Sequence, residues 1–457
     1  MATQSQIEAN RVNLLLICRP LTEERRASSS PNPFKTASPA AQIATVCLRY
    51  HRVPVHRRHF YLLLLCLLAI IPYLARVCIS VAGPRMQDAL HISPEQWGWV
   101  GTVFLLGYAL FEIPSGHLGD RLGARAILTR IVLWWSAFTA LTGAVSAYPL
   151  LLLVRLLFGA GEAGAFPNAS VAISNWFSPA TRGRAFGLFT MCSQIGGALS
   201  PLLVLPIQQS FGWRMSFFVF GSLGALWSAV WFWKYSDRPS TAEPVTVDRA
   251  SWRPILVSRD LWAIMGLTFG YVYTMGFFQT WFHTYLVRGR AFSEQALSLS
   301  ALPYAFGAVA NLLGGFTCDW LVRRVGVKWS RRSVGMTGLL SAAAGMTCAL
   351  FANSHLAVIL CLSLSYAGVT FQQPVVWASC LDIGGSRGGA VSGFMNTAGQ
   401  LGGALSSLVF GYIVKATGNY DIPLIPMAAF LAIGALLWRT VDVTCRIPLQ
   451  TERAISV

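Results

Sequence analysis

Two charged residues stand inside an apolar run that is long enough to cross a lipid bilayer. Arg155 and Glu162 lie seven positions apart within residues 150–176. Because seven residues are close to two turns of a helix, both side chains fall on one face, about 10 Å apart along the axis. A charge at bilayer depth costs about 2.5–3.5 kcal/mol on insertion scales. We expect the two groups to form a buried structural ion pair or, as the favoured interpretation, to face a charged cavity inside a helix bundle.

A third charge, Arg76, lies inside an earlier apolar segment. An arginine at this depth needs an anion, and its planar guanidinium group can hold a carboxylate through two parallel hydrogen bonds. The alternative is that the side chain extends to the outer membrane surface, because Arg76 lies past the middle of its segment.

The composition indicates a polytopic membrane protein. Of 457 residues, 54% are hydrophobic and 12% charged, whereas soluble proteins carry about 25% charged residues. The net charge of +17 does not indicate a nucleic-acid partner, because lysine and arginine occur in short clusters between apolar runs. The ten cysteines show no paired CxxC spacing and mostly lie in apolar segments, so we expect no metal site, no disulfide and no cofactor.

Twelve apolar segments of spanning length are predicted to be membrane helices. They lie at 60–83, 97–118, 126–147, 149–175, 184–208, 213–235, 259–285, 294–318, 333–353, 355–380, 387–414 and 422–442. The gaps between segments are alternately rich and poor in arginine and lysine, which places both termini in the cytoplasm of a protein of the inner (plasma) membrane. The predicted domains are a disordered cytoplasmic tail at 1–59, a six-helix bundle at 60–235, a cytoplasmic linker at 236–258, a second six-helix bundle at 259–442 and a cytoplasmic tail at 443–457.

The two halves of the membrane region repeat each other. The sequence QIGGALS at 194–200 recurs as QLGGALS at 400–406, and GHLGDRLG at 116–123 has a weaker echo beginning at Gly315. Both echoes have nearly the same offset, so we infer a duplicated six-helix unit. Parallel repeats of this kind place a binding site near the membrane midplane, between the halves.

The loop after the second segment contains spaced glycines and an Asp-Arg pair. Gly116 and Gly123 permit a tight turn, and Asp120 can cap a helix or pair with an arginine. The pattern G-x-L-x-D-R-x-G-x-R resembles the signature loop of the major facilitator superfamily. This resemblance implies an all-α membrane protein with twelve transmembrane helices in two pseudo-symmetric six-helix bundles, and a cytoplasmic gate that includes Asp120 and Arg121.

The fourth segment resembles a narrower group within that superfamily. The run from Arg155 to Asn168, followed by WFSP at 176–179 and RGRA at 182–185, is similar to the anion:cation symporter family. That family includes bacterial galactonate, glucarate, hexuronate, tartrate and phthalate transporters, together with the animal sialic acid and vesicular glutamate carriers.

The resemblance implies roles for individual residues. Arg76 would bind the substrate carboxylate, with Tyr73 donating a hydrogen bond beside it. Glu162 would be the proton-coupling carboxylate, held and tuned by Arg155. Further pocket residues would be Tyr108, Gln194, Gln279, Trp377 and Asn396.

Two features depart from the family or refine the expected substrate. Ala75 stands where proton-coupled bacterial members often carry an aspartate, which leaves coupling through Glu162 alone, an altered stoichiometry, or no coupling. Pro374, Val375 and Val376 precede Trp377, and none carries a hydroxyl group for a sugar chain. This favours a less hydroxylated carboxylate.

These observations predict a monomeric secondary transporter that moves a small organic carboxylate inward with a proton by alternating access. A gradient-independent uniporter or exchanger remains an alternative, and so does a transporter-like sensor. An enzyme is not expected, because the apolar segments carry no His/Cys/Asp cluster and no Ser–His–Asp pattern.

Overall fold

The computed structural model describes residues 55–177, 179–237, 253–293, 296–384 and 388–444, and these are helical apart from short connections. The first half contains α3 (Val55–Ala89), α4 (Pro94–Ala144), α5 (Tyr148–Glu162), α6 (Ala165–Trp176), α7 (Pro179–Phe211) and α8 (Trp213–Lys234). The second half contains α9 (Arg253–Leu256), α10 (Arg259–Thr280), α11 (Phe282–Thr284), η1 (Tyr285–Gly289), η2 (Ala296–Ala301), α12 (Leu302–Phe351), α13 (His355–Gly384), α14 (Gly388–Thr417) and α15 (Leu424–Leu437).

The predicted twelve membrane crossings are confirmed. Within the described ranges, nine helical stretches are long and apolar enough to span a membrane by length and composition. One of these, Ala296–Phe351, is long enough for two crossings, and the shorter α15 and the first part of α4 supply the remaining two. Helices suit this environment because they satisfy their own backbone hydrogen bonds where water is absent.

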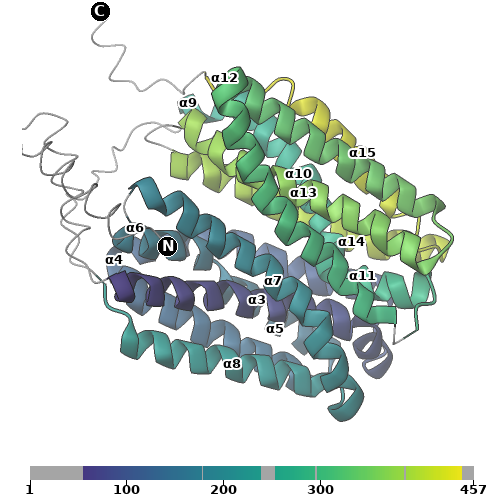
Figure 1. Ribbon diagram of the computed structural model, residues 1–457. Coiled ribbons are helices and arrows are strands. Elements are labelled where there is room, and N and C mark those ends of the chain that lie inside the picture. The colour runs from purple at the N-terminus through teal and green to yellow at the C-terminus, as the bar shows by residue number, and fades with distance from the viewer. Residues whose placement is uncertain (1–54, 178, 238–252, 294–295, 385–387, 445–457) are drawn as a thin grey trace, which may run out of the picture.

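The helices form two bundles that lie side by side (Figure 1). Helices α3 to α8, coloured purple to teal, form one bundle, and α10 to α15, coloured green to yellow, form the other. Extensive packing between α4 and α5 and between α12 and α13 holds each bundle together, while α4 against α14 and α7 against α12 join the two.

In each half, the loop that joins the second and third crossings turns at a glycine. Gly123 and Gly326 have φ angles of 79° and 80°, a left-handed conformation that side chains with a Cβ rarely adopt. In the first half, the Asp237 carboxylate accepts a hydrogen bond from the backbone N–H of Arg125 at 3.1 Å. This caps the helix that restarts after Gly123.

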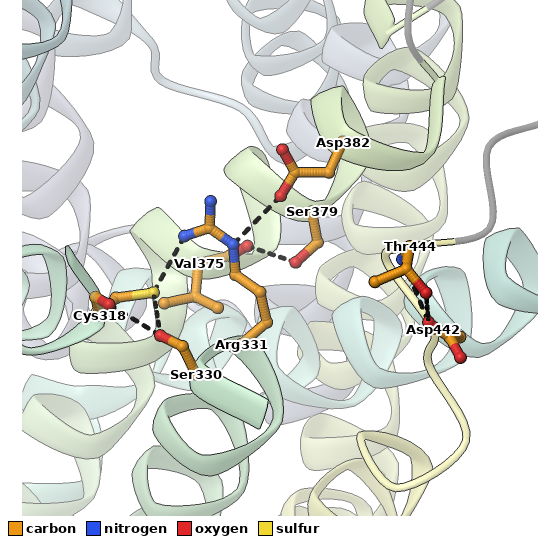
Figure 2. Close-up of polar contacts among 8 residues, drawn as sticks. All are labelled: Cys318, Ser330, Arg331, Val375, Ser379, Asp382, Asp442 and Thr444. Carbon is orange, nitrogen blue, oxygen red and sulfur yellow. Dashed lines mark hydrogen bonds and ion pairs between the residues drawn. The ribbon is translucent and has the colours of Figure 1, made fainter. Parts of the chain in front are cut away.

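The second half repeats this arrangement with another aspartate. Asp442, which follows the last crossing, pairs with Lys328, two residues after Gly326. The Lys328 ammonium group lowers the pKa of Asp442 to about 2. Figure 2 shows Asp442 with its Thr444 contact. Each half therefore ties its Gly turn to the chain that leaves its final crossing.

A polar cluster fixes the same end of the second bundle (Figure 2). Arg331 donates to Asp382 of α13 at 3.2 Å and to the Cys318 sulfur at 2.9 Å, and Ser330 donates to the Cys318 carbonyl. The cluster links the two parts of α12 to α13.

Several predicted features lie outside the described residues. These are most of the tails at 1–59 and 443–457 and most of the linker at 236–258. The side chains of Asp120 and Arg121 and the exposure of Gly116 also lie outside what is described. Their predicted roles stay predictions.

We predict that Gly326→Ala destabilises the protein by about 1–2 kcal/mol, because a Cβ is strained at positive φ. Gly187→Ala is the matched control: at both positions an added Cβ meets no atom within 4 Å, but only Gly326 has positive φ. Chemical unfolding in detergent micelles, followed by tryptophan fluorescence, measures both. Equal stability of the two variants would contradict the assignment of strain to Gly326.

Candidate functional site

A buried ion pair lies at the centre of the first bundle. The Nε group of Arg76 on α3 donates to Oε1 of Glu162 on α5 at 2.8 Å. The two side chains are only 8% and 3% exposed. Removing two charges from water costs several kcal/mol per ion, and mutual attraction compensates only when the geometry is good. Each charged group therefore depends on the other to offset the free-energy cost of its burial.

Aromatic rings surround the Arg76 guanidinium group. Its central carbon lies 4.9 Å from the ring centre of Tyr108, 5.3 Å from that of Phe104 and 5.6 Å from that of Tyr73. Ring faces attract a cation at these distances. Tyr73 and Tyr108, both predicted pocket residues, are thus adjacent to the predicted carboxylate-binding arginine.

Arg155 lies beside this pair and, in the described part of the chain, forms no ion pair of its own. Its guanidinium carbon sits 4.6 Å from the ring centre of Phe104 and 4.9 Å from that of Phe158, and its buried Nε has no hydrogen-bond partner among the described residues. It interacts electrostatically with both Arg76 and Glu162. The hydrogen bond that reaches Glu162 comes from Arg76 and not from Arg155. Two guanidinium groups therefore lie near one carboxylate, which is hydrogen-bonded to Arg76 alone. The positive charge left over attracts a further anion.

Glycines allow the helices that carry these residues to approach closely. A Cβ at Gly107 of α4 would lie 2.4 Å from the carbonyl oxygen of Leu156, and a Cβ at Gly159 of α5 would lie 2.1 Å from that of Phe104. Gly164, with a φ of 87°, breaks the fourth crossing two residues after Glu162. The sequence prediction of one continuous helix at 149–175 misses this break.

The remaining predicted pocket residues lie on both bundles. Gln194 of α7 accepts a hydrogen bond at 2.8 Å from the hydroxyl group of Tyr366 on α13, so it bridges the bundles. Asn396 of α14 donates to Glu112 of α4 and also bridges them. Trp377 and Gln279 are half-buried, and neither forms a hydrogen bond with the ion pair among the described residues.

Two residues of this region were not predicted from the sequence. Tyr366 carries no distinguishing signal, because most tyrosines of membrane helices only pack. Glu112 does carry a signal: it is a charge inside the apolar segment 97–118, the criterion that singled out Glu162.

Contacts between the bundles concentrate at the end where α3 finishes and α4 begins, which we call the sealed end (residues 80–101). There Arg288 pairs with Asp88 and Lys415 pairs with Glu95. The Trp97 indole donates to the Thr280 carbonyl at 3.1 Å. The opposite end, which contains Gly123 and Gly326, is called the glycine-turn end below.

Comparison with known sequences matches this chain to a superfamily of membrane transporters and to proteins named as transporters. The sequence profile of the Major Facilitator Superfamily matches residues 65–407. The "Probable sulfoacetate transporter" of Cupriavidus necator is 32% identical, over 88% of this chain and 98% of its own length. The hexuronate transporter of Bacillus subtilis is 31% identical, over 82% and 91%, and the D-galactonate transporter of Escherichia coli is 28% identical, over 84% and 95%.

A solved structure shares the fold. It is a bacterial homologue of the human lysosomal transporter Spinster in an inward-facing, unoccupied conformation, with a TM-score of 0.71 and 20% identity, covering 86% of this chain and 98% of that one. At this identity the likeness concerns the fold alone.

We predict that Arg76→Ala lowers the unfolding free energy by about 3–5 kcal/mol, because it leaves Glu162 buried without its partner. Arg288→Ala is the matched control. It breaks a pair in which the Asp88 side chain is 75% exposed, and such exposed pairs contribute about 0–1 kcal/mol. Chemical unfolding in detergent micelles measures both variants. If Arg76→Ala and Arg288→Ala unfold alike, the buried pair does not stabilise the bundle.

Proposed function

The chain belongs to the Major Facilitator Superfamily, and we propose that it is a secondary active transporter of the anion:cation symporter type, carrying a small organic carboxylate with a proton. The observation that carries this proposal is the buried Arg76–Glu162 pair with Arg155 beside it. The substrates that name the relatives, sulfoacetate, hexuronate and galactonate, are all carboxylates.

The ion pair supplies a simple coupling mechanism. A substrate carboxylate that binds the Arg76 guanidinium group must displace Glu162 from it. The displaced carboxylate is then a buried charge without its partner, which costs free energy. Protonation removes that cost because it neutralises the carboxylate. Binding of the anion therefore favours binding of a proton. A singly charged carboxylate leaves the net charge of the cluster unchanged, whereas sulfoacetate, which also carries a sulfonate, lowers it by one, and the positive charge of Arg155 beside the pair offsets that second negative charge.

Orientation follows from the distribution of arginine and lysine. The glycine-turn end carries Arg125, Lys328, Arg331 and Arg332, and positively charged loops face the cytoplasm. We place this end, both termini and the Asp120–Arg121 gate with Gly116 and Gly123 on the cytoplasmic side of the plasma membrane. The sealed end then faces outward, and opening the site to the outside requires its two ion pairs to separate.

The pocket favours a small acid with few hydroxyl groups. Val375 and Val376 are fully buried, so the absence of hydroxyl groups there does not bear on the substrate. The aromatic rings around Arg76 are a stronger argument, because Phe104 offers no hydrogen bond and Tyr73 and Tyr108 offer one hydroxyl group each. Gln194, Gln279, Trp377 and Asn396 would contact the rest of the substrate. All of these residues belong to one chain, so a monomer would suffice for transport.

Uptake into proteoliposomes tests the substrate class. We predict accumulation of radiolabelled sulfoacetate in preference to glucuronate and D-galactonate, driven by an inward proton gradient. Arg76→Ala should lower apparent affinity by about 10- to 100-fold, as expected for loss of a hydrogen bond between charged groups. Arg76→Lys should retain part of the wild-type affinity for the substrate. Arg214→Ala, which removes an exposed arginine on α8, is the control. Unchanged affinity in Arg76→Ala would exclude Arg76 from the binding site.

A second variant tests proton coupling. Glu162→Gln keeps the size of the side chain but cannot take up a proton, so we predict a strong reduction of gradient-driven accumulation with retained substrate exchange. Counterflow into substrate-loaded vesicles measures the exchange. Accumulation equal to that of the wild type in Glu162→Gln would assign coupling elsewhere. Wild-type transport that ignores the gradient would identify a uniporter or an exchanger.

A further inference from the structure

A second carboxyl group is buried where the two bundles meet. Glu112 of α4 is 8% exposed. Its Oε1 accepts a hydrogen bond from the side-chain amide of Asn396 on α14. Its Oε2 is buried and has no hydrogen-bond partner among the residues that the structure describes. A buried ionised carboxylate needs positive partners or several hydrogen bonds, and Glu112 has one hydrogen bond from a neutral amide.

Glu112 lies between the central ion pair and the glycine-turn end. The contacts between α4 and α14 follow the two antiparallel helices: Glu95 pairs with Lys415 at the sealed end, and the Thr102 hydroxyl donates to the Ala404 carbonyl at 2.9 Å further along. Glu112 with Asn396 comes next toward Gly123. Tyr108, whose ring contacts Arg76, stands one turn before Glu112. A proton leaving the central pair for the glycine-turn end therefore passes near Glu112.

The charges that face Glu112 leave it only partly compensated. From α3, Arg76 attracts it, but that guanidinium group is hydrogen-bonded to Glu162 of α5. Among the described side chains of its own helix, Tyr108 is the titratable group that interacts with it. From α14 the facing group is the neutral Asn396. A neutral carboxylic acid fits these contacts, since one oxygen accepts from Asn396 while the other carries the proton.

We propose that Glu112 is a second proton-carrying group of the transport cycle and that its hydrogen bond to Asn396 breaks as the bundles part at the glycine-turn end. This rests on the proposed function. With the bundles in contact, Glu112 keeps its proton in a dry interface. When they part, water reaches the carboxyl group, the O–H bond breaks, and the proton passes to water while the carboxylate remains. The chain then moves one proton on Glu162 and one on Glu112.

Proteoliposomes separate this role from a structural one. Losing one coupled proton at a membrane potential of 100 mV lowers the accumulation ratio by about 50-fold. Using radiolabelled sulfoacetate as the probe, we expect Glu112→Gln to show a reduction of that size with counterflow retained. The control is Thr102→Val, which removes another hydrogen bond between α4 and α14 but no titratable group. It should keep both activities.

An infrared titration tests the proposal without any substrate. Purified wild-type protein should show a carboxylic-acid carbonyl band that disappears as pH rises, and Glu112→Gln should lack that component while Thr102→Val keeps it. A band identical in Glu112→Gln and wild type, or full accumulation by Glu112→Gln, would overturn the proposal. Failure of the wild type to transport any tested anion would instead count against the proposed function, and the infrared result would still decide the protonation of Glu112.

Discussion

The structure depends on one buried interaction, the ion pair between Arg76 and Glu162. Neither charge tolerates an apolar bundle alone, so the helices that carry them must stay in register. The close approach of α4 and α5 at Gly107 and Gly159 packs the surrounding rings against the pair. The same dependence makes the pair useful, because an incoming anion can separate the two groups only if something else compensates Glu162. In the proposed mechanism a proton meets that need, so that the same interaction would both stabilise the bundle and couple the proton to the substrate.

The two ends of the molecule differ in what their polar contacts connect, the two bundles at the sealed end and parts of one bundle at the glycine-turn end. At the sealed end, ion pairs such as Asp88–Arg288 are partly exposed and so contribute little individually, which suits contacts that must break in every cycle. At the glycine-turn end, Asp237 and Asp442 tie each turn to its own half, so each bundle moves as a unit. The central pair and Glu112 lie between these ends.

Hydropathy and charge spacing predicted the twelve crossings and the duplication, because each crossing must hide its backbone in lipid. The break at Gly164 was not predicted, since a helix tolerates an isolated glycine. In the structure the break shows in the φ of 87° at Gly164, where an added Cβ would also clash with Ser115. The sequence also could not show which helices adjoin. Periodicity placed Arg155 and Glu162 on one face, but the partner of Glu162 comes from α3. Glu112 was missed although it met the criterion of a charge at bilayer depth.

The central claim is that an anion and a proton bind together because the anion displaces Glu162 from Arg76. Isothermal titration calorimetry in buffers of different ionisation enthalpy measures it most directly, since it counts the protons taken up when sulfoacetate binds the detergent-solubilised protein. The account predicts proton uptake on binding by the wild type and a loss of that uptake in Glu162→Gln. Tight binding to the wild type with no proton uptake would contradict it.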